Sequence, residues 1–161
     1  MKRIPFLLMC FLSLSCGRDN EAHKTVPIIG SETPIVRLDI NNTTMHFIID
    51  TGSDISFINE NTYQSGHYLF TILDSSILNF NTLNNTNTVI EGTIVTTTLD
   101  ETLCTNFTVY DIEHIVDNVF ITTGILIDGI IGNDSLREWD AIIDFERQEF
   151  TYTHNNKIDY D

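Results

Sequence analysis

The chain has 161 residues and a formal net charge of -15. This length suits one domain, and a hydrophobic content of 42% is enough for a packed core, which argues against wholesale disorder. A surface this acidic repels nucleic acid and anionic lipid, and neither is therefore expected as a partner. Acidity keeps a protein soluble but does not identify a substrate.

The first residues have the pattern of an export signal. Lys2 and Arg3 form a cationic start, and residues 4–14 are an apolar run that is too short to span a bilayer. Small residues then flank Cys16. The segment resembles a bacterial lipoprotein signal, although Ser13 stands where an aliphatic residue is expected. The resemblance implies that Cys16 becomes a lipid-bearing N-terminus and anchors an exported protein in a bacterial cell envelope. The alternative is an ordinary secretory signal cut nearby.

These patterns divide the chain into four parts. Residues 1–16 are interpreted as the signal peptide and residues 17–27 as a polar tether. Residues 28–154 form the expected domain, and residues 155–161 are a tail.

The pattern of residues after the leader predicts a mostly β structure. Residues 34–40 and 44–49 alternate apolar with polar side chains around the turn signal Asn41-Asn42, which predicts a hairpin that ends at Asp50. Further strands are predicted at residues 55–58, 77–80, 88–99, 103–112, 141–145 and 149–153. Residues 59–65 fit either one helical turn or a loop, and residues 134–139 form the best helix, capped by Asn133 or Asp134. We therefore expect an all-β fold, a small closed barrel with one short helix near the C-terminus.

Cysteine and histidine give no sign of a metal or redox site. Cys104 is the only cysteine outside the leader, and its alternating flanks predict a small buried thiol rather than a nucleophile. The histidines are scattered without the paired spacing of zinc ligands, so no metal and no cofactor is expected. They are His23, His46, His67, His114 and His154.

The run Asp50-Thr51-Gly52-Ser53 is the candidate for chemistry. It follows an apolar strand, and a carboxylate at the end of a buried strand is costly unless hydrogen bonds receive it. Gly52 lets the chain turn tightly and brings backbone N–H groups near the carboxylate. Thr51 and Ser53 add short hydroxyls. Asp-Thr-Gly alone recurs by chance, but the preceding strand strengthens the case.

A second segment, residues 127–136, is an apolar strand that ends in glycine and leads into a capped helix. Together with the Asp50 loop it resembles the retropepsin-like aspartic proteases, most closely their bacterial single-lobe members, over residues 28–154. The resemblance implies a role for each matching residue. Asp50 would be the catalytic carboxylate, Thr51 would hold two catalytic loops together, Gly52 would permit the loop shape, Ser53 would hydrogen-bond the outer oxygen of Asp50, and Ile131 and Gly132 would give structural support.

One feature departs from this family. Its mobile flap often has a glycine-rich tip, whereas the candidate tip at residues 82–87 has asparagine and no glycine. Asparagine tolerates the same left-handed turns, so a flap stays possible. The chain near Gly92 is the other candidate.

The chemistry of this family needs two facing carboxylates, one ionised and one protonated, which share a proton. The chain has one Asp-Thr-Gly, so the resemblance implies a homodimer that brings two copies of Asp50 together on a two-fold axis. The other candidate acids lack the Thr-Gly loop and are interpreted as turn, cap and surface positions. They are Asp54, Asp128, Asp134 and Asp144.

Three functions remain open from the sequence. The first is an aspartic endopeptidase that hydrolyses peptide bonds of a peptide or protein substrate with water activated by two Asp50 carboxylates. The second is a catalytically silent, peptide- or partner-binding lipoprotein with the same fold. The third is an unrelated β-barrel with a chance turn. The intact Asp-Thr-Gly-Ser run favours the first over the second, because a binder has no need for an unhindered acid there.

Overall fold

The computed structural model describes residues 22–30, 32–66, 69–81, 87–100 and 103–154. The strands are β1 (Ala22–Ile29), β2 (Ile35–Ile40), β3 (Thr43–Ile49), β4 (Phe57–Asn59), β5 (Thr71–Asn81), β6 (Asn87–Leu99), β7 (Leu103–Tyr110), β8 (Gly129–Ile131), β9 (Ile142–Asp144) and β10 (Glu149–His154). The helices of these described parts are α1 (Glu60–Ser65), α2 (Glu113–Thr123) and α3 (Asn133–Glu138).

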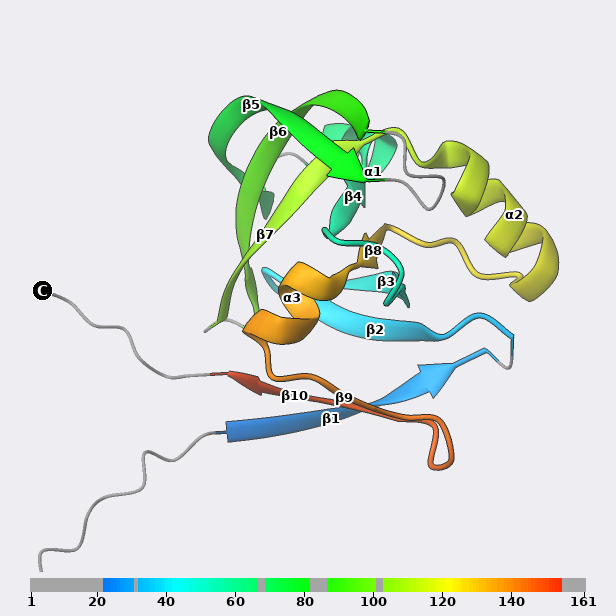
Figure 1. The fold of residues 1–161 in the computed structure, drawn as a ribbon. Helices are drawn as coiled ribbons and strands as arrows, with labels where there is room; N and C mark the ends of the chain where they lie inside the picture. The colour runs from blue at the N-terminus through cyan, green and yellow to red at the C-terminus, as the bar shows by residue number, and fades with distance from the viewer. Residues whose placement is uncertain (1–21, 31, 67–68, 82–86, 101–102, 155–161) are drawn as a thin grey trace, which may run out of the picture.

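Six strands close into a barrel in the order β2, β3, β8, β4, β7 and β6 (Figure 1). The closure is the pairing of β6 with β2 at Leu99 and Ile40. Two backbone hydrogen bonds reinforce it, from Asn41 N to the Thr98 carbonyl at 2.7 Å and from Asp100 N to the Asp39 carbonyl at 3.0 Å. The predicted mostly-β closed barrel is therefore confirmed.

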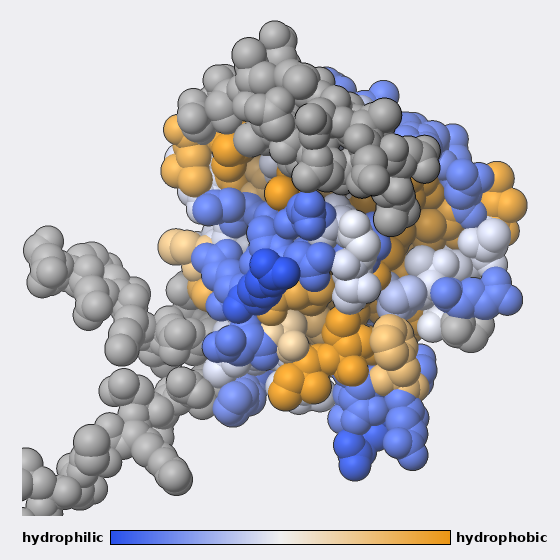
Figure 2. All heavy atoms as spheres, viewed as in Figure 1, coloured by the Kyte–Doolittle hydropathy of each residue, from blue (hydrophilic) through white to orange (hydrophobic). Residues whose placement is uncertain are grey.

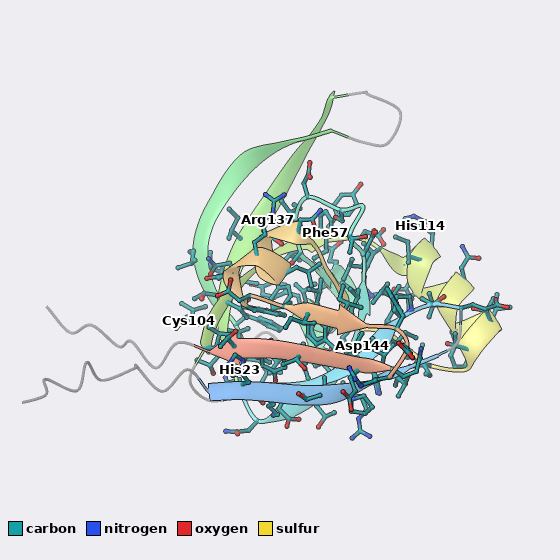
Figure 3. The ribbon with its side chains drawn as sticks, turned by 60° about the horizontal axis from the view of Figure 1, so that its bottom comes forward. His23, Phe57, Cys104, His114, Arg137 and Asp144 are labelled. Atoms are coloured by element: carbon teal, nitrogen blue, oxygen red, sulfur yellow. The ribbon has the colours of Figure 1, made fainter. Side chains whose placement is uncertain are left out.

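A second, three-stranded layer lies beside the barrel, in the order β1, β10 and β9 (Figures 1 and 3). β1 pairs with β10 from Ala22 opposite His154 to Pro27 opposite Glu149. The expected tether of residues 17–27 is therefore wrong from Ala22 onward. The reason is that the partner strand comes from the far end of the chain, where local patterning gives no sign of it.

The core has two parts. Inside the barrel, Phe47 stacks on Phe107 with ring centroids 5.4 Å apart, and Trp139 and Tyr152 are fully buried. Outside the barrel, a second cluster fills the space between β2, β8 and α2. Its buried members are Ile35, Ile112, Val116, Val119, Ile127 and Ile130. The outer cluster also takes in Ile48 of β3 and Phe57 of β4, so α2 covers the barrel on the side of β2, β3, β8 and β4.

The expectation of a single helix is incomplete. Within residues 59–65, for which a helical turn or a loop was expected, Glu60–Ser65 form α1. The sequence analysis did not predict α2. α2 forms because Ile112, Val116 and Val119 recur at helical spacing and bury together, and because Gly124 ends the helix with a left-handed φ of 73°.

The prediction of a buried thiol at Cys104 is wrong, because this residue is exposed. β7 does alternate as expected, but the inward positions are Thr105 and Phe107, which places Cys104 on the outer face of the barrel. Figure 3 labels it at the end of the molecule near His23.

The hairpin of β5 and β6 projects from the barrel (Figure 3). Its strands pair from Thr71 opposite Thr96 to Asn81 opposite Asn87. Gly92 lies within β6 opposite Ser76, so it is not at a turn, and the alternative flap tip is wrong. Of the expected tip, residues 82–86 lie outside the described residues.

Among the described residues no helix is long and apolar enough to cross a membrane. Within the same residues, no group of three or more His, Cys, Asp and Glu side chains could hold a metal ion. Figure 3 shows His23 and His114 at opposite ends of the molecule.

The acidic composition does not produce a uniformly hydrophilic surface. Figure 2 shows hydrophobic patches among hydrophilic ones on the face of Figure 1. The large exposed hydrophobic residues are Ile72, Leu73, Tyr110, Phe120, Ile121, Leu126, Ile142 and Phe145.

We predict that Gly129→Ala destabilises the fold. A Cβ atom at Gly129 would lie 2.3 Å from the Phe57 carbonyl oxygen and 2.8 Å from the Phe47 ring. The unfolding free energy should fall by about 3 kcal/mol in chemical denaturation. Gly124→Ala is the matched control, because its Cβ would meet nothing within 4 Å; its left-handed φ should cost about 1 kcal/mol. Equal losses would contradict the close packing of β8.

Candidate active site

Asp50 lies at the end of β3, where its backbone is held on both sides. Its N–H donates to the Ile131 carbonyl at 2.9 Å, and the neighbouring Ile49 N–H donates to the Pro34 carbonyl at 2.9 Å. The position of Asp50 is therefore fixed by β8 on one side and by the start of β2 on the other. Asp50, Thr51 and Gly52 are nevertheless exposed.

Gly52 shapes the loop as expected. Its N–H donates to Asp50 Oδ1 at 2.9 Å, and the Ser53 N–H donates to the Asp50 carbonyl at 3.1 Å. A Cβ atom at Gly52 would lie 3.2 Å from Asp50 Oδ1. A side chain there would press on the carboxylate, so glycine lets the backbone N–H approach it closely.

The predicted hydrogen bond from Ser53 to the outer oxygen of Asp50 is wrong in this structure. The Ser53 hydroxyl donates to the Ile55 carbonyl at 2.7 Å. Short hydroxyl side chains readily bond to backbone groups two residues away, and the turn brings this carbonyl within reach. Ser53 therefore stabilises the turn, and no described residue donates a hydrogen bond to the outer oxygen of the carboxylate.

Thr51 is exposed, and its carbonyl accepts a hydrogen bond from Asn133 Nδ2 at 2.8 Å. This contact joins the loop to the first residue of α3. The predicted role of the Thr51 side chain, which holds two such loops together, concerns a partner chain and stays a prediction.

Ile131 and Gly132 lie directly beneath the loop. Ile131 is fully buried and pairs with Ile49 across the parallel strands β8 and β3. A Cβ atom at Gly132 would lie 2.3 Å from the Ile55 carbonyl oxygen. Only glycine fits here, so the segment just after β8 runs in direct contact with the segment that leads from the loop to β4.

A polar network that the sequence did not reveal joins the loop to α3. Ser56 is fully buried, and its hydroxyl donates to Asp134 Oδ1 at 2.6 Å. Ser56 Oγ also accepts the Gly132 N–H at 2.9 Å and lies 2.7 Å from the Ser135 hydroxyl. The Ser56 N–H also donates to Asp134 Oδ2 at 3.0 Å. Every hydrogen-bonding site of the buried Ser56 side chain is thus used.

Asp134 consequently does not have the helix-capping role that was expected. The N-cap of α3 is Gly132, without a side-chain hydrogen bond, and Asn133 is already helical. The signal for the network was a serine between two apolar residues, Ile55 and Phe57, which local patterning assigns only to a strand.

The other candidate acids are occupied elsewhere. Asp128 Oδ2 accepts the His46 N–H at 2.8 Å at the opposite end of β8 from the loop, and burial raises the pKa of Asp128. The backbone N–H of Arg147 lowers the pKa of Asp144, helped by its guanidinium at 2.8 Å. Asp54 is exposed and follows the loop. Among the described residues, the Asp50 loop therefore presents one open carboxylate.

A closed six-stranded barrel that carries an exposed Asp-Thr-Gly-Ser loop defines the retropepsin-like class of folds. The sequence model of the aspartyl protease family matches residues 36–135, which is more than half of the chain. The chain belongs to this aspartyl protease family.

Several solved structures are similar to the chain. A retropepsin-like aspartic protease from Rickettsia conorii has 13% identity and a TM-score of 0.46, with 83% of this chain and 90% of that chain covered. The EIAV protease in complex with the inhibitor HBY-793 has 18% identity and a TM-score of 0.46, with 68% and 93% covered. The retroviral protease-like domain of Ddi1 from Leishmania major has 15% identity and a TM-score of 0.45, with 80% and 99% covered. No curated protein sequence matches the chain.

We predict that Ser56→Ala destabilises the protein by about 2 kcal/mol, because it leaves the Gly132 N–H without its acceptor and removes one of the hydrogen bonds to the Asp134 carboxylate. Chemical denaturation measures the change. Ser65→Ala is the control, since the exposed Ser65 hydroxyl bonds only to the Thr62 carbonyl and its loss should cost less than about 0.5 kcal/mol. A Ser56→Ala protein as stable as the control would mean that the network contributes nothing.

Proposed function

We propose that the chain is an aspartic endopeptidase that cleaves peptide bonds with a water molecule activated at Asp50. The observation that carries this proposal is an open carboxylate on the loop that matches the motif of its family. The carboxylate accepts a hydrogen bond from the Gly52 N–H, and its other oxygen accepts none from the described residues. Water and an extended substrate can therefore reach it.

The second carboxylate comes from a second copy of the chain. Asp134 and Asp144 are held by hydrogen bonds within the chain, and Asp128 lies at the far end of β8. The exposed loop of Asp50 is free to meet the same loop of a partner across a two-fold axis. A homodimer thus supplies two carboxylates without any further acid from this chain.

In such a pair one carboxylate is ionised and the other protonated, because two like charges this close cannot both ionise. The ionised Asp50 takes a proton from the attacking water. The protonated Asp50 of the other copy donates its proton to the oxygen of the scissile carbonyl. In this proposal the β5–β6 hairpin, which projects from the barrel, is the flap that covers an extended peptide.

Residues 1–16 lie outside the described residues, and for them we propose a lipoprotein signal with Cys16 as the lipid-bearing residue. Membrane attachment would raise the local concentration of chains and favour the dimer. The support is the pattern of Lys2, Arg3, an apolar run and Cys16 between small residues.

We predict that Asp50→Asn abolishes peptide cleavage while the thermal unfolding temperature stays within a few degrees of wild type. The amide keeps the shape of the side chain but cannot take up the proton of water. Asp54→Asn is the matched control, because it removes the same charge from an exposed position of the same loop and should keep most activity. The measurement is release of fragments from a mixed peptide library. Wild-type cleavage by the Asp50→Asn protein would show that Asp50 is not the catalyst.

We predict that cleavage is fastest at acidic pH, on the order of pH 4 to 6, because a pair of carboxylates keeps its shared proton only below neutrality. A pH profile of kcat/KM checks this. A rate that keeps rising to pH 8 would contradict a shared proton.

We predict that Cys16→Ser releases the exported protein from membranes. Fractionation of cells and mass spectrometry of the N-terminus measure the outcome. A wild-type protein that is wholly soluble, with an N-terminus beyond Cys16, would exclude the lipid anchor.

A further inference from the structure

A cavity of about 410 Å³ lies between the turn that joins β1 to β2 and the C-terminal end of α2. It is lined by Gly30, Glu32, Thr33, Thr122, Thr123 and Ile125. The volume is within the range of about 300–1,000 Å³ that is usual for ligand pockets. Neither the aspartate loop nor its supporting glycines belong to it.

The pairing of β2 with β3 brings this cavity close to the Asp50 loop. Ile35 pairs with Ile48, and the Ile49 N–H donates to the Pro34 carbonyl at 2.9 Å. Thr33, which lines the cavity, precedes Pro34, and Asp50 follows Ile49. The cavity lining and the aspartate are therefore each one residue away from the same backbone hydrogen bond.

α2 packs beside the same two strands. Ile35 of β2 and Ile48 of β3 belong to the hydrophobic cluster that also contains Val116 and Val119 of α2. The C-terminal end of α2 thus lines the cavity beside the strands that lead to the Asp50 loop. A peptide bound at Asp50 can reach the cavity with a side chain close to the scissile bond.

The end of α2 presents hydrogen-bond acceptors to the cavity. The Thr122 hydroxyl donates to the Asn118 carbonyl at 3.0 Å, and the Thr123 hydroxyl donates to the Val119 carbonyl at 2.7 Å. Each hydroxyl has a single proton, which is used within the helix, so only oxygen lone pairs remain for a ligand. Thr123 also accepts the Ile125 N–H at 3.1 Å, which fixes this wall.

Among the described residues that line the cavity, Glu32 carries the only formal charge. Acceptor oxygens and a carboxylate together suit a side chain rich in donors and positive in charge, while an acidic side chain would meet repulsion. We propose that this cavity binds an arginine or lysine side chain of the substrate, and that Glu32 determines this preference. The inference rests on the proposed protease function.

Two peptides test this at pH 6. They differ in one residue near the scissile bond, which is arginine in one peptide and glutamine in the other. The wild-type protein should cleave the arginine peptide with the higher kcat/KM. Glu32→Gln should lower the ratio of the two kcat/KM values about tenfold. Glu146→Gln, which removes an exposed carboxylate from the turn between β9 and β10, should keep the wild-type ratio. An unchanged ratio in Glu32→Gln would overturn the assignment.

A binding experiment separates this inference from the protease proposal. The Asp50→Asn protein is titrated with the same two peptides, and the backbone amide signals are followed by NMR. The arginine peptide should shift the signals of Thr33, Thr122 and Thr123, and the glutamine twin should shift them much less. Shifts confined to other residues, or equal shifts with both peptides, would refute the cavity as a basic subsite even if cleavage is observed. Specific shifts without any cleavage by the wild type would instead support the cavity and refute the protease.

Discussion

The structure depends on the insertion of the three-residue strand β8 between β3 and β4. β8 pairs in parallel with β3 and antiparallel with β4, and so completes the barrel. Gly129 and Gly132 permit this insertion. A Cβ atom at either position would lie 2.3 Å from a backbone oxygen of the adjacent segment, that of Phe57 or Ile55. The carbonyl of Ile131 then receives the Asp50 N–H. Close backbone packing therefore fixes the position of the aspartate.

A carboxylate held in this way is both fixed and open. The backbone of the loop is anchored to β8 and, through Asn133, to α3, while the buried Ser56 network joins the outgoing strand to the same helix. The side chain of Asp50 remains exposed. Rigid support with an accessible acid is what general acid–base chemistry needs. The proposed cleavage needs a pair of such acids, and this requirement is the reason for proposing a second copy of the chain.

The sequence was sufficient for features that depend on neighbouring residues. Strand alternation, the Asn41-Asn42 turn and the glycine of the Asp50 loop predicted the hairpin and the barrel. The sequence was insufficient where the structure depends on a partner far along the chain. β1 forms by pairing with β10, and the buried Ser56 hydroxyl is satisfied by Asp134. α2 was missed because its β-branched residues favour strands by propensity, although Ile112, Val116 and Val119 recur with helical period. Ser53 and Cys104 were misplaced because a residue type alone does not determine which carbonyl or which face it meets.

The central claim is that two Asp50 side chains act together, and mixed dimers test it most directly. Wild type and Asp50→Asn protein are mixed in equal amounts, allowed to exchange partners, and assayed at the same total concentration as wild type alone. If both carboxylates are needed, only dimers of two wild-type chains are active, and random pairing leaves about one quarter of the activity. A remaining activity of about one half would mean that each chain works alone, and it would contradict the shared active site.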